Sequence, residues 1–251
     1  MPNAWDEGSA RLFASIGCAA IATTSGGFAV TRGRLDGAMS REEVLSHSGD
    51  LSRAVNVPVS ADLENCFADQ PDGVAATITD AIAEGLAGGS VEDFTRDREN
   101  PIYELRHAAE RVWAAAEAAH NGSVKFVLTA RAENYLHGRP DLADTIARLQ
   151  TYQEAGADVL LAPRVVDPVE LRQLLASVDV PVSVLITPDA PAIGALAELG
   201  VSRISVGGAI AAASYGFAVE AVKELQTNGL ANYWEQAGAA RADMAASFVK
   251  P

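Results

Sequence analysis

The chain has 251 residues, a length typical of one large α/β barrel and sufficient to bury a substantial core. Its 19 basic and 33 acidic side chains give a formal charge of -14, which disfavours nucleic acid and anionic membrane surfaces as partners. No window reaches the roughly 18 consecutive apolar residues of a membrane span, and the first residues lack the basic and apolar regions of a signal peptide. We therefore expect a cytoplasmic protein with no membrane partner.

Short apolar runs rich in β-branched residues recur along the chain and predict seven strands. They lie at 18–24, 57–61, 88–92, 124–130, 157–163, 180–186 and 202–208. Segments of helical length separate the runs, and three carry start signals: a Ser40/Glu43 capping box, Asn100-Pro101 and Asp167-Pro168. Strand followed by helix, repeated, predicts a parallel sheet, and apolar runs without alternation indicate strands covered on both faces. A closed (β/α)8 barrel and a doubly wound sheet both fit.

A barrel needs an eighth strand, which has to precede Trp5. Only four residues stand there, so either the first strand is very short or the chain lacks residues that related proteins have. No linker or change of composition divides the chain, and we predict one domain over 1–251. The last helical stretch, about 230–248, exceeds what one barrel needs. Its apolar side chains, such as Trp234 and Phe248, would pack on the barrel or on another subunit.

Carboxylates gather where two neighbouring strands are predicted to end. Asp62 and Glu64 follow one strand, and Glu92 and Asp93 follow the next. Ligands of parallel α/β proteins bind at the carboxyl ends of strands, and carboxylates that converge there repel one another unless a cation neutralises them. Hard oxygen ligands of this kind suit Mg²⁺, with Mn²⁺ as the alternative. The competing interpretation is that these residues cap helices and meet solvent.

Two further strand ends offer groups that bind anions. Arg131 directly follows the 124–130 run and offers a planar fork for a carboxylate or phosphonate. The Ser25-Gly26-Gly27 segment places small residues where backbone N–H groups can approach an oxyanion, although a glycine pair also suits a plain turn. Cys66 has no metal-binding spacing and is interpreted as core filler rather than as a nucleophile.

Six motifs occur in an order that one superfamily shares. They read "PNAWDEGSARLFASIGCAAIATTSGG", "DGAMSREE", "PVSADLENCFAD", "GGSVED", "TARAENYL" and "LGVSRISVGG". With them the chain resembles the isocitrate lyase / phosphoenolpyruvate (PEP) mutase superfamily, whose PEP phosphonomutase-like members it matches over almost its whole length. The resemblance implies a (β/α)8 barrel in homodimers that exchange a C-terminal helix and can pair into homotetramers. It also implies a Mg²⁺-dependent enzyme that makes or breaks a bond next to the oxo group of a small anionic 2-oxo acid.

The resemblance implies roles for the residues that bind substrate. Ser25, Gly26 and Gly27 would hold the substrate carboxylate and oxo group, and Arg131 would clamp the anionic end of the substrate. Arg131 is therefore expected to be both a substrate-binding and a catalytic residue.

The resemblance also implies a metal shell. Asp62 would ligate Mg²⁺ directly, and Glu64 and Glu92 would act largely through metal-bound waters. Asp36 would support that shell and is expected to be catalytic in this sense. The metal would polarise the oxo oxygen and stabilise the enolate that forms as the bond breaks.

The chain departs from the superfamily in the loop after Glu92. Isocitrate and methylisocitrate lyases carry a Lys-Lys/Arg-Cys-Gly-His signature there, and phosphonomutases and phosphonopyruvate hydrolases carry lysine and asparagine. The present loop reads "VEDFTRDRENPIYEL", in which Arg96, Arg98 and Asn100 could play a related part. Cys66 also stands where the superfamily commonly has glycine.

Three functions follow from these features. The first is a Mg²⁺-dependent lyase that cleaves a carbon–carbon bond in a small 2-oxo or 2-hydroxy polycarboxylate, with decarboxylation the simplest case because it needs no acid/base pair. The second is a phosphonopyruvate-type mutase or hydrolase, which acts on a carbon–phosphorus bond. The third is a catalytically degenerate barrel that binds a dicarboxylate.

Overall fold

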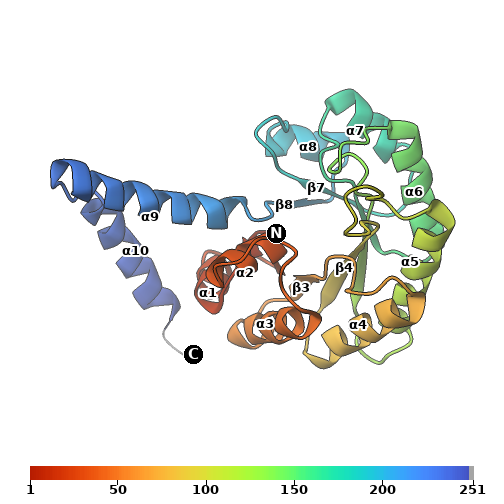
Figure 1. The fold of residues 1–251 in the computed structure, drawn as a ribbon, viewed down its shortest axis with the longest axis horizontal. Coiled ribbons are helices and arrows are strands. Elements are labelled where there is room, and N and C mark those ends of the chain that lie inside the picture. The colour runs from red at the N-terminus through yellow and green to blue at the C-terminus, as the bar shows by residue number, and fades with distance from the viewer. Residues whose placement is uncertain (249–251) are drawn as a thin grey trace.

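A computed structural model describes residues 1–248 and contains eight parallel strands in one sheet, ordered as in the sequence (Figure 1). The strands are β1 Asn3–Ala4, β2 Ile21–Thr23, β3 Val59–Asp62, β4 Gly88–Glu92, β5 Val127–Arg131, β6 Val159–Leu161, β7 Val182–Leu185 and β8 Arg203–Ser205. The seven predicted strands are confirmed as β2 to β8. The missing first strand is the two-residue β1, immediately before Trp5.

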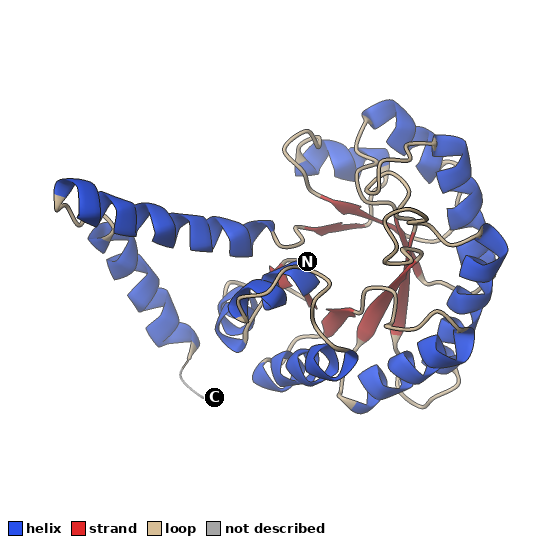
Figure 2. Cartoon of the chain, in the orientation of Figure 1, coloured by secondary structure: helices blue, strands red, loops and turns tan. Residues whose placement is uncertain are grey.

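Helices cover the outside of the strands, so that the chain forms a nearly closed (β/α)8 barrel (Figure 2). They are α1 Glu7–Ser15, α2 Ser25–Thr31, α3 Arg41–Ala54, α4 Pro71–Ala83, α5 Leu105–His120, α6 Leu142–Glu154, α7 Pro168–Leu175, α8 Ile193–Leu199, α9 Ala209–Asn228 and α10 Trp234–Ser247. The predicted barrel is therefore confirmed, and the doubly wound alternative is wrong.

The helix start signals are confirmed in two cases and wrong in one. Ser40 and Glu43 form a reciprocal capping box on α3, and Asp167 caps α7 ahead of Pro168. Asn100-Pro101 starts no helix, because α5 begins only at Leu105 with Glu104 as its cap. The reason is a local pairing: Phe94 forms an antiparallel bridge with Ile102, and the Thr95 N–H donates to the Pro101 carbonyl at 2.8 Å, so Pro101 belongs to a closed loop instead of a helix.

The side chain of Asn3 joins the first strand to the last. Backbone ladders of the described residues run from β1 through to β8. Across the seam between β8 and β1, Asn3 Oδ1 accepts the N–H groups of Val206 at 2.9 Å and Gly207 at 3.0 Å. Asn3 Nδ2 donates to the carbonyl of Thr23 at 2.8 Å. One amide thus connects β1, β2 and the segment after β8, which fixes the short first strand in place.

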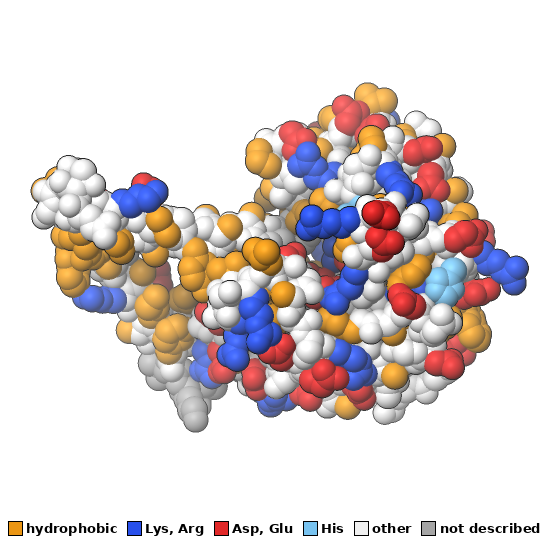
Figure 3. All heavy atoms as spheres, in the orientation of Figure 1, with side chains coloured by type: hydrophobic (Ala, Val, Ile, Leu, Met, Phe, Trp, Pro, Cys, Tyr) orange, Lys and Arg blue, Asp and Glu red, His pale blue; other side chains and the backbone are white. Residues whose placement is uncertain are grey.

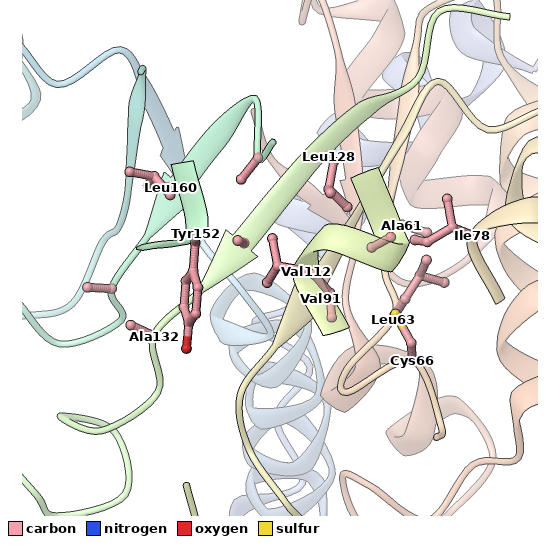
Figure 4. Packing of buried hydrophobic residues seen from close by; sticks show 14 of the residues in the cluster. Ala61, Leu63, Cys66, Ile78, Val91, Val112, Leu128, Ala132, Tyr152 and Leu160 are labelled. Carbon is pink, nitrogen blue, oxygen red and sulfur yellow. The ribbon is translucent and has the colours of Figure 1, made fainter. Parts of the chain in front are cut away.

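The strands alternate between an apolar face toward the helices and a polar face toward the barrel axis. On β3, Val59 and Ala61 belong to the buried core, whereas Ser60 and Asp62 line an interior cavity. Figure 4 shows part of the core, with Ala61 beside Ile78 of α4. The interior carries hydroxyls where barrels usually pack branched aliphatic side chains: Thr23, Ser60, Ser90, Thr129, Ser183 and Ser205. The barrel axis is therefore a polar environment.

Helices α9 and α10 extend away from the barrel as a V, and the end of α10 returns to α1 (Figure 1). Ser247 bonds Ser15 of α1 through their hydroxyls at 2.7 Å. Many large apolar side chains on this pair are exposed: Tyr215, Phe217, Val219, Val222, Leu225, Leu230, Trp234, Met244 and Phe248. Figure 3 shows apolar side chains gathered over the two helices. Among residues 1–248, no helix is both long and apolar enough to cross a membrane.

We propose that the α9–α10 pair packs on a second copy of the chain, because exposed apolar surface of this extent is costly in water. We expect sedimentation equilibrium to give a dimer or tetramer, and Phe217→Glu together with Val222→Glu to shift the protein to monomer. Leu35→Glu, on an exposed barrel loop, is the control and should leave the mass unchanged. A wild-type protein that sediments as a monomer at micromolar concentration would contradict the proposal.

His47 makes folding stability depend on pH. Its ring stacks on Phe28 of α2 with 3.7 Å between centroids, and burial lowers the pKa of the imidazole to about 4. The unfolded chain takes up this proton near pH 6.5, so the free energy of unfolding falls as pH drops from 6.5 toward 4 and is unaffected above that window. Between pH 7 and pH 4.5, we expect the free energy of unfolding measured with urea to fall by about 2 kcal/mol less in His47→Gln than in the wild type. Equal pH profiles for both proteins would contradict this assignment.

Candidate active site

The predicted site residues lie at the carboxyl ends of β2 to β5, on one end of the barrel. Asp62, Glu92 and Arg131 are the last residues of β3, β4 and β5. Ser25 begins α2, directly after β2, where the Thr24 side chain caps the helix. Because neighbouring parallel strands end side by side, these residues come together as the sequence predicted.

Arg131 lies at the centre of a cluster of carboxylates. Its Nη1 is 2.9 Å from Asp62 Oδ1 and its Nη2 is 3.1 Å from Glu92 Oε2. Nε and Nη2 both reach Glu133 Oε1 at 2.8 Å. Burial by itself would lower the pKa of the guanidinium, but Glu133, Glu92 and Asp62 raise the pKa well above its ordinary value. Arg131 is therefore a permanent cation whose donors are directed at acidic side chains.

Glu64 lies over this cluster on a segment with unusual backbone geometry. Glu64, Cys66 and Phe67 have φ values of 52, 57 and 56°, a left-handed region that favours glycine. Cys66 Sγ is fully buried, and burial raises the pKa of its thiol to about 12. The interpretation of Cys66 as core filler is confirmed.

The two oxygens of Glu64 have different surroundings. Oε2 forms a salt bridge with Arg96, whose guanidinium also lies over the Phe67 ring at 4.9 Å from its centroid. Oε1 is buried and has no hydrogen-bond partner among residues 1–248. A buried, unpaired carboxylate oxygen is costly, and burial raises the pKa of Glu64. This oxygen needs a donor or a cation that the described residues do not supply.

Asp36 and the glycine segment pack against each other. A Cβ on Gly26 would lie 3.2 Å from Asp36 Oδ2, and one on Gly27 would lie 2.5 Å from Thr24 Cγ2 and 2.9 Å from Trp5 Cβ. Only glycine fits at Gly27, because those neighbours cannot withdraw. The N–H of Ser25 donates to Asp62 Oδ2 at 3.1 Å. The start of α2 is thereby tied to the carboxylate predicted to hold a metal.

Asp93 does not join the cluster, although its neighbour Glu92 does. Successive residues of a strand face opposite sides, and Asp93 faces the helices. Its carboxylate accepts the Tyr152 hydroxyl at 2.6 Å, Arg148 Nη1 at 3.1 Å and the backbone N–H of Glu133 at 2.8 Å. The expectation that Asp93 converges with the other acids is therefore wrong. Asp93 instead fixes the backbone that presents Glu133.

Glu133 is a site residue that the sequence analysis missed. It is 1% exposed, it accepts from Arg131, and its Oε2 is 3.7 Å from His137 Nε2. Burial raises the pKa of Glu133 despite the neighbouring Arg131. Its place two residues after the strand-end arginine was an available signal, because residues 131 and 133 can face the same side.

Of the three candidate residues in the loop after β4, only one contacts a residue of the site. Arg96 reaches the site through Glu64. Arg98 is exposed, and Asn100 donates to Asp97 at 3.4 Å within the loop itself. Phe94 of the same loop stacks on His137 at 3.9 Å between ring centroids. The loop thus covers the carboxylate cluster with an arginine and an aromatic ring.

The surroundings fit a divalent cation in charge and in donor chemistry. Carboxylates outnumber arginines here, burial raises the pKa of Glu64 and Glu92, and Glu64 Oε1 lacks a partner. The described side chains do not form a cluster of three or more potential ligands around one point. Mg²⁺ usually takes only one or two carboxylates and keeps several waters, so this arrangement remains compatible with it. Asp62, Glu64 and Glu92 stay the predicted metal residues.

Replacement of Arg131 tests how strongly the cluster depends on its cation. Arg131→Met leaves buried Glu92 and Glu133 without a positive partner, and we expect it to lower the free energy of unfolding by about 3–5 kcal/mol at pH 7. Mg²⁺ should restore part of this loss if it binds beside Asp62. Arg172→Met, on an exposed position of α7, serves as the control. Unchanged urea midpoints for Arg131→Met would show that the cluster is not held by this guanidinium.

The fold agrees with comparisons to known proteins. A crystal structure of a provisionally named lyase/mutase from Burkholderia cenocepacia J2315 aligns with a TM-score of 0.95 and 45% identity, covering 100% of this chain and 90% of that one. The uncharacterized protein Rv1998c of Mycobacterium tuberculosis is 32% identical over 209 residues, covering 82% of this chain and 76% of the relative.

Curated relatives with named activities are more distant. Oxaloacetate decarboxylase 2 of Pseudomonas fluorescens is 26% identical over 173 residues, covering 67% of this chain and 57% of that protein. The 2-methylisocitrate lyase of Escherichia coli is 28% identical over 157 residues, covering 60% of this chain and 52% of that protein.

The model of one protein family, described as phosphoenolpyruvate phosphomutase, matches residues 1–226. That range contains the whole barrel and every predicted site residue, from Ser25 to Arg131. The chain therefore belongs to the phosphoenolpyruvate phosphomutase family, within the PEP mutase/isocitrate lyase superfamily.

Proposed function

We propose that the protein is a Mg²⁺-dependent lyase that cleaves a carbon–carbon bond in a small 2-oxo polycarboxylate, with decarboxylation of an oxaloacetate-like acid as the preferred reaction. The observation that carries the proposal is the buried excess of carboxylates at the ends of β3 and β4, with Glu64 Oε1 unpaired among the described residues. The cavity beside Asp62 has a volume of about 100 Å³, which suits a ligand of a few carbon atoms.

Asp62, Glu64 and Glu92 would hold the metal, and Asp36 would support Glu64 from the neighbouring loop. When bound, Mg²⁺ supplies Lewis-acid polarisation of the 2-oxo oxygen. The residues of the chain would bind and orient the substrate: Ser25–Gly27 would hold its carboxylate end, with the Ser25 N–H shared with Asp62 and the Gly27 N–H with Thr24. Arg131 holds Asp62 and Glu92 in a fixed orientation and remains the predicted partner of the anionic substrate.

The residues that line the cavity favour decarboxylation over retro-aldol cleavage. Retro-aldol cleavage needs a base to remove the hydroxyl proton and an acid to protonate the carbanion, whereas a decarboxylation needs neither for bond cleavage. Within the described chain, the lining consists of hydroxyls, apolar groups, Asn3, Asp62, Arg131, Arg203 and Met1, whose amino group donates to the Ile204 carbonyl at 2.8 Å. His137 lies farther out, against Glu133 and Phe94, and burial lowers the pKa of its ring. A curated relative named oxaloacetate decarboxylase supports the same choice.

A phosphonopyruvate-type mutase or hydrolase is the second candidate. The specific observation in its favour is Arg96, a cation from the loop after β4 that reaches the site at Glu64 and would confine a phosphoryl group. The family model bears the name of a phosphomutase. The third candidate, a barrel that binds a dicarboxylate without turning it over, shares the same binding residues.

A substrate panel followed by NMR tests these candidates. The panel contains oxaloacetate, isocitrate, methylisocitrate, dimethylmalate and phosphonopyruvate, each with Mg²⁺ and with EDTA. We expect Mg²⁺-dependent loss of oxaloacetate that falls at least about 100-fold in Asp62→Asn, because a metal ligand is lost. Asp72→Asn, on the surface at the start of α4, should retain full activity.

Each other outcome points to a different candidate. Turnover of phosphonopyruvate alone would favour the second, and an Arg96→Met variant would then identify its loop cation. Binding of oxaloacetate without turnover of any panel member would favour the third. Turnover that survives EDTA would overturn the metal-dependent mechanism.

A further inference from the structure

Arg203 is a partly buried arginine that the proposed reaction does not use. It lies on β8 with its side chain toward the barrel axis, where it lines the same cavity as Asp62 and Arg131. Its Nη2 donates to Thr129 Oγ1 at 2.8 Å and its Nε donates to Ser183 Oγ at 3.2 Å. Both partners are neutral hydroxyls. Its third nitrogen, Nη1, makes no hydrogen bond to any residue from 1 to 248.

Three other arginines in the interior of the described chain, two of them buried and Arg131 partly buried, are compensated differently. Arg131 contacts three carboxylates, and Arg148 contacts Asp93 and Asp144. Arg111 donates to three backbone carbonyls. Arg203 has no carboxylate within 4 Å in residues 1–248, and burial lowers the pKa of its guanidinium to about 10. An unpaired cation in a barrel interior lowers the stability of the fold unless an anion binds to it.

The neighbours of Arg203 hold it open toward the cavity. Thr129 and Ser183 come from β5 and β7 and fix two of the three nitrogens, so little side-chain freedom remains to be lost when an anion binds. Ser90 and Ser205, which also line the cavity, offer further hydroxyl donors. Such a preformed cluster of donors around a cation matches the needs of a carboxylate or phosphonate group.

Arg131 cannot offer free donors to a substrate anion unless its own contacts rearrange. Its Nε, Nη1 and Nη2 already donate to Glu133, Asp62 and Glu92, and any substrate anion placed there has to compete with them. Arg203 has no such competitors among the described residues. Because Arg203 and Asp62 line one small cavity, a ligand of a few atoms can reach both.

We propose that Arg203, with the hydroxyls of Thr129 and Ser183, forms a second anion subsite that binds the distal carboxylate or phosphonate of the substrate. This inference rests on the proposed function, in which the 2-oxo acid end of the substrate lies at Asp62 and Ser25–Gly27. The subsite selects dianionic acids over monoanionic 2-oxo acids such as pyruvate, since only the former neutralise both ends of the cavity.

The test compares ligands that differ in the distal group. Calorimetry in the presence of Mg²⁺ measures binding of oxalate, which has no distal group, and of 3,3-difluorooxaloacetate and phosphonopyruvate, which have one. We expect Arg203→Met to weaken the two longer ligands about 10- to 100-fold, as for loss of a charge-assisted hydrogen bond, and oxalate less than about 2-fold. The longer ligand that loses more identifies the distal group. Arg172→Met on α7 is the matched control and should change none of them.

Several outcomes would overturn the subsite. Equal affinity of the wild type and Arg203→Met for both longer ligands would do so, and so would a loss that is the same for oxalate as for the longer ligands. If Arg203→Met fails to fold, as judged by circular dichroism, Arg203→Lys replaces it. The lysine variant cannot span both hydroxyls and a ligand, so we expect several-fold weakening of the longer ligands with oxalate unchanged.

A metal-free measurement separates this inference from the proposed function. In EDTA, malonate should raise the melting temperature of the wild type and not that of Arg203→Met or Arg203→Lys. If oxalate fails to bind the wild type with Mg²⁺ while malonate still stabilises it through Arg203, the proposed function is wrong and the subsite stands. If malonate stabilises all three proteins equally, or none of them, the subsite is wrong.

Discussion

The arrangement of the barrel mouth depends on one buried cation, the guanidinium of Arg131, held among carboxylates from three consecutive segments. Strand register makes this contact possible: Glu92 pairs with Arg131, so β4 and β5 end level with each other, and Asp62 pairs with Ser90, two residues before the end of β4. Without that positive charge, these poorly exposed carboxyl groups would take up protons, or their mutual repulsion would move them apart toward solvent. The cluster therefore couples the charge state of the site to the alignment of the strands.

The same alignment is supported from outside the barrel. Asp93, on the helix-facing side, bonds Tyr152 and Arg148 of α6 and holds the backbone of Glu133. A helix that never touches the cavity thus fixes the position of an acid that orients Arg131. Glu92, the last residue of β4, belongs to the interior charge cluster, and Asp93, which follows it, supports the cluster from outside. Substitutions on α6 would reach the site by this route.

The strand ends could be predicted because each combines an apolar run with a polar residue at its close, as at Asp62 and Arg131. The facing direction of Asp93 could not, since it depends on which residue the pleat turns inward. Arg203 was hidden for another reason: a charged residue inside a short β-branched run looks like surface until the barrel closes around it. The sequence also did not show that Arg131 donates to carboxylates of the protein itself, because one of its partners, Glu133, was not recognised as a site residue. Sequence spacing thus located the mouth, but not how its charges are balanced.

The seam at Asn3 has a consequence for how the protein is made. The amide of Asn3 bonds residues 203 and 204 positions away in the chain. During synthesis, these two bonds of Asn3 can form only after Gly207 has left the ribosome. Closure of the barrel is then a late event between residues far apart in the chain, although the entropy cost of closing a loop grows only slowly with its length. Before it happens, the polar interior lies open along one edge.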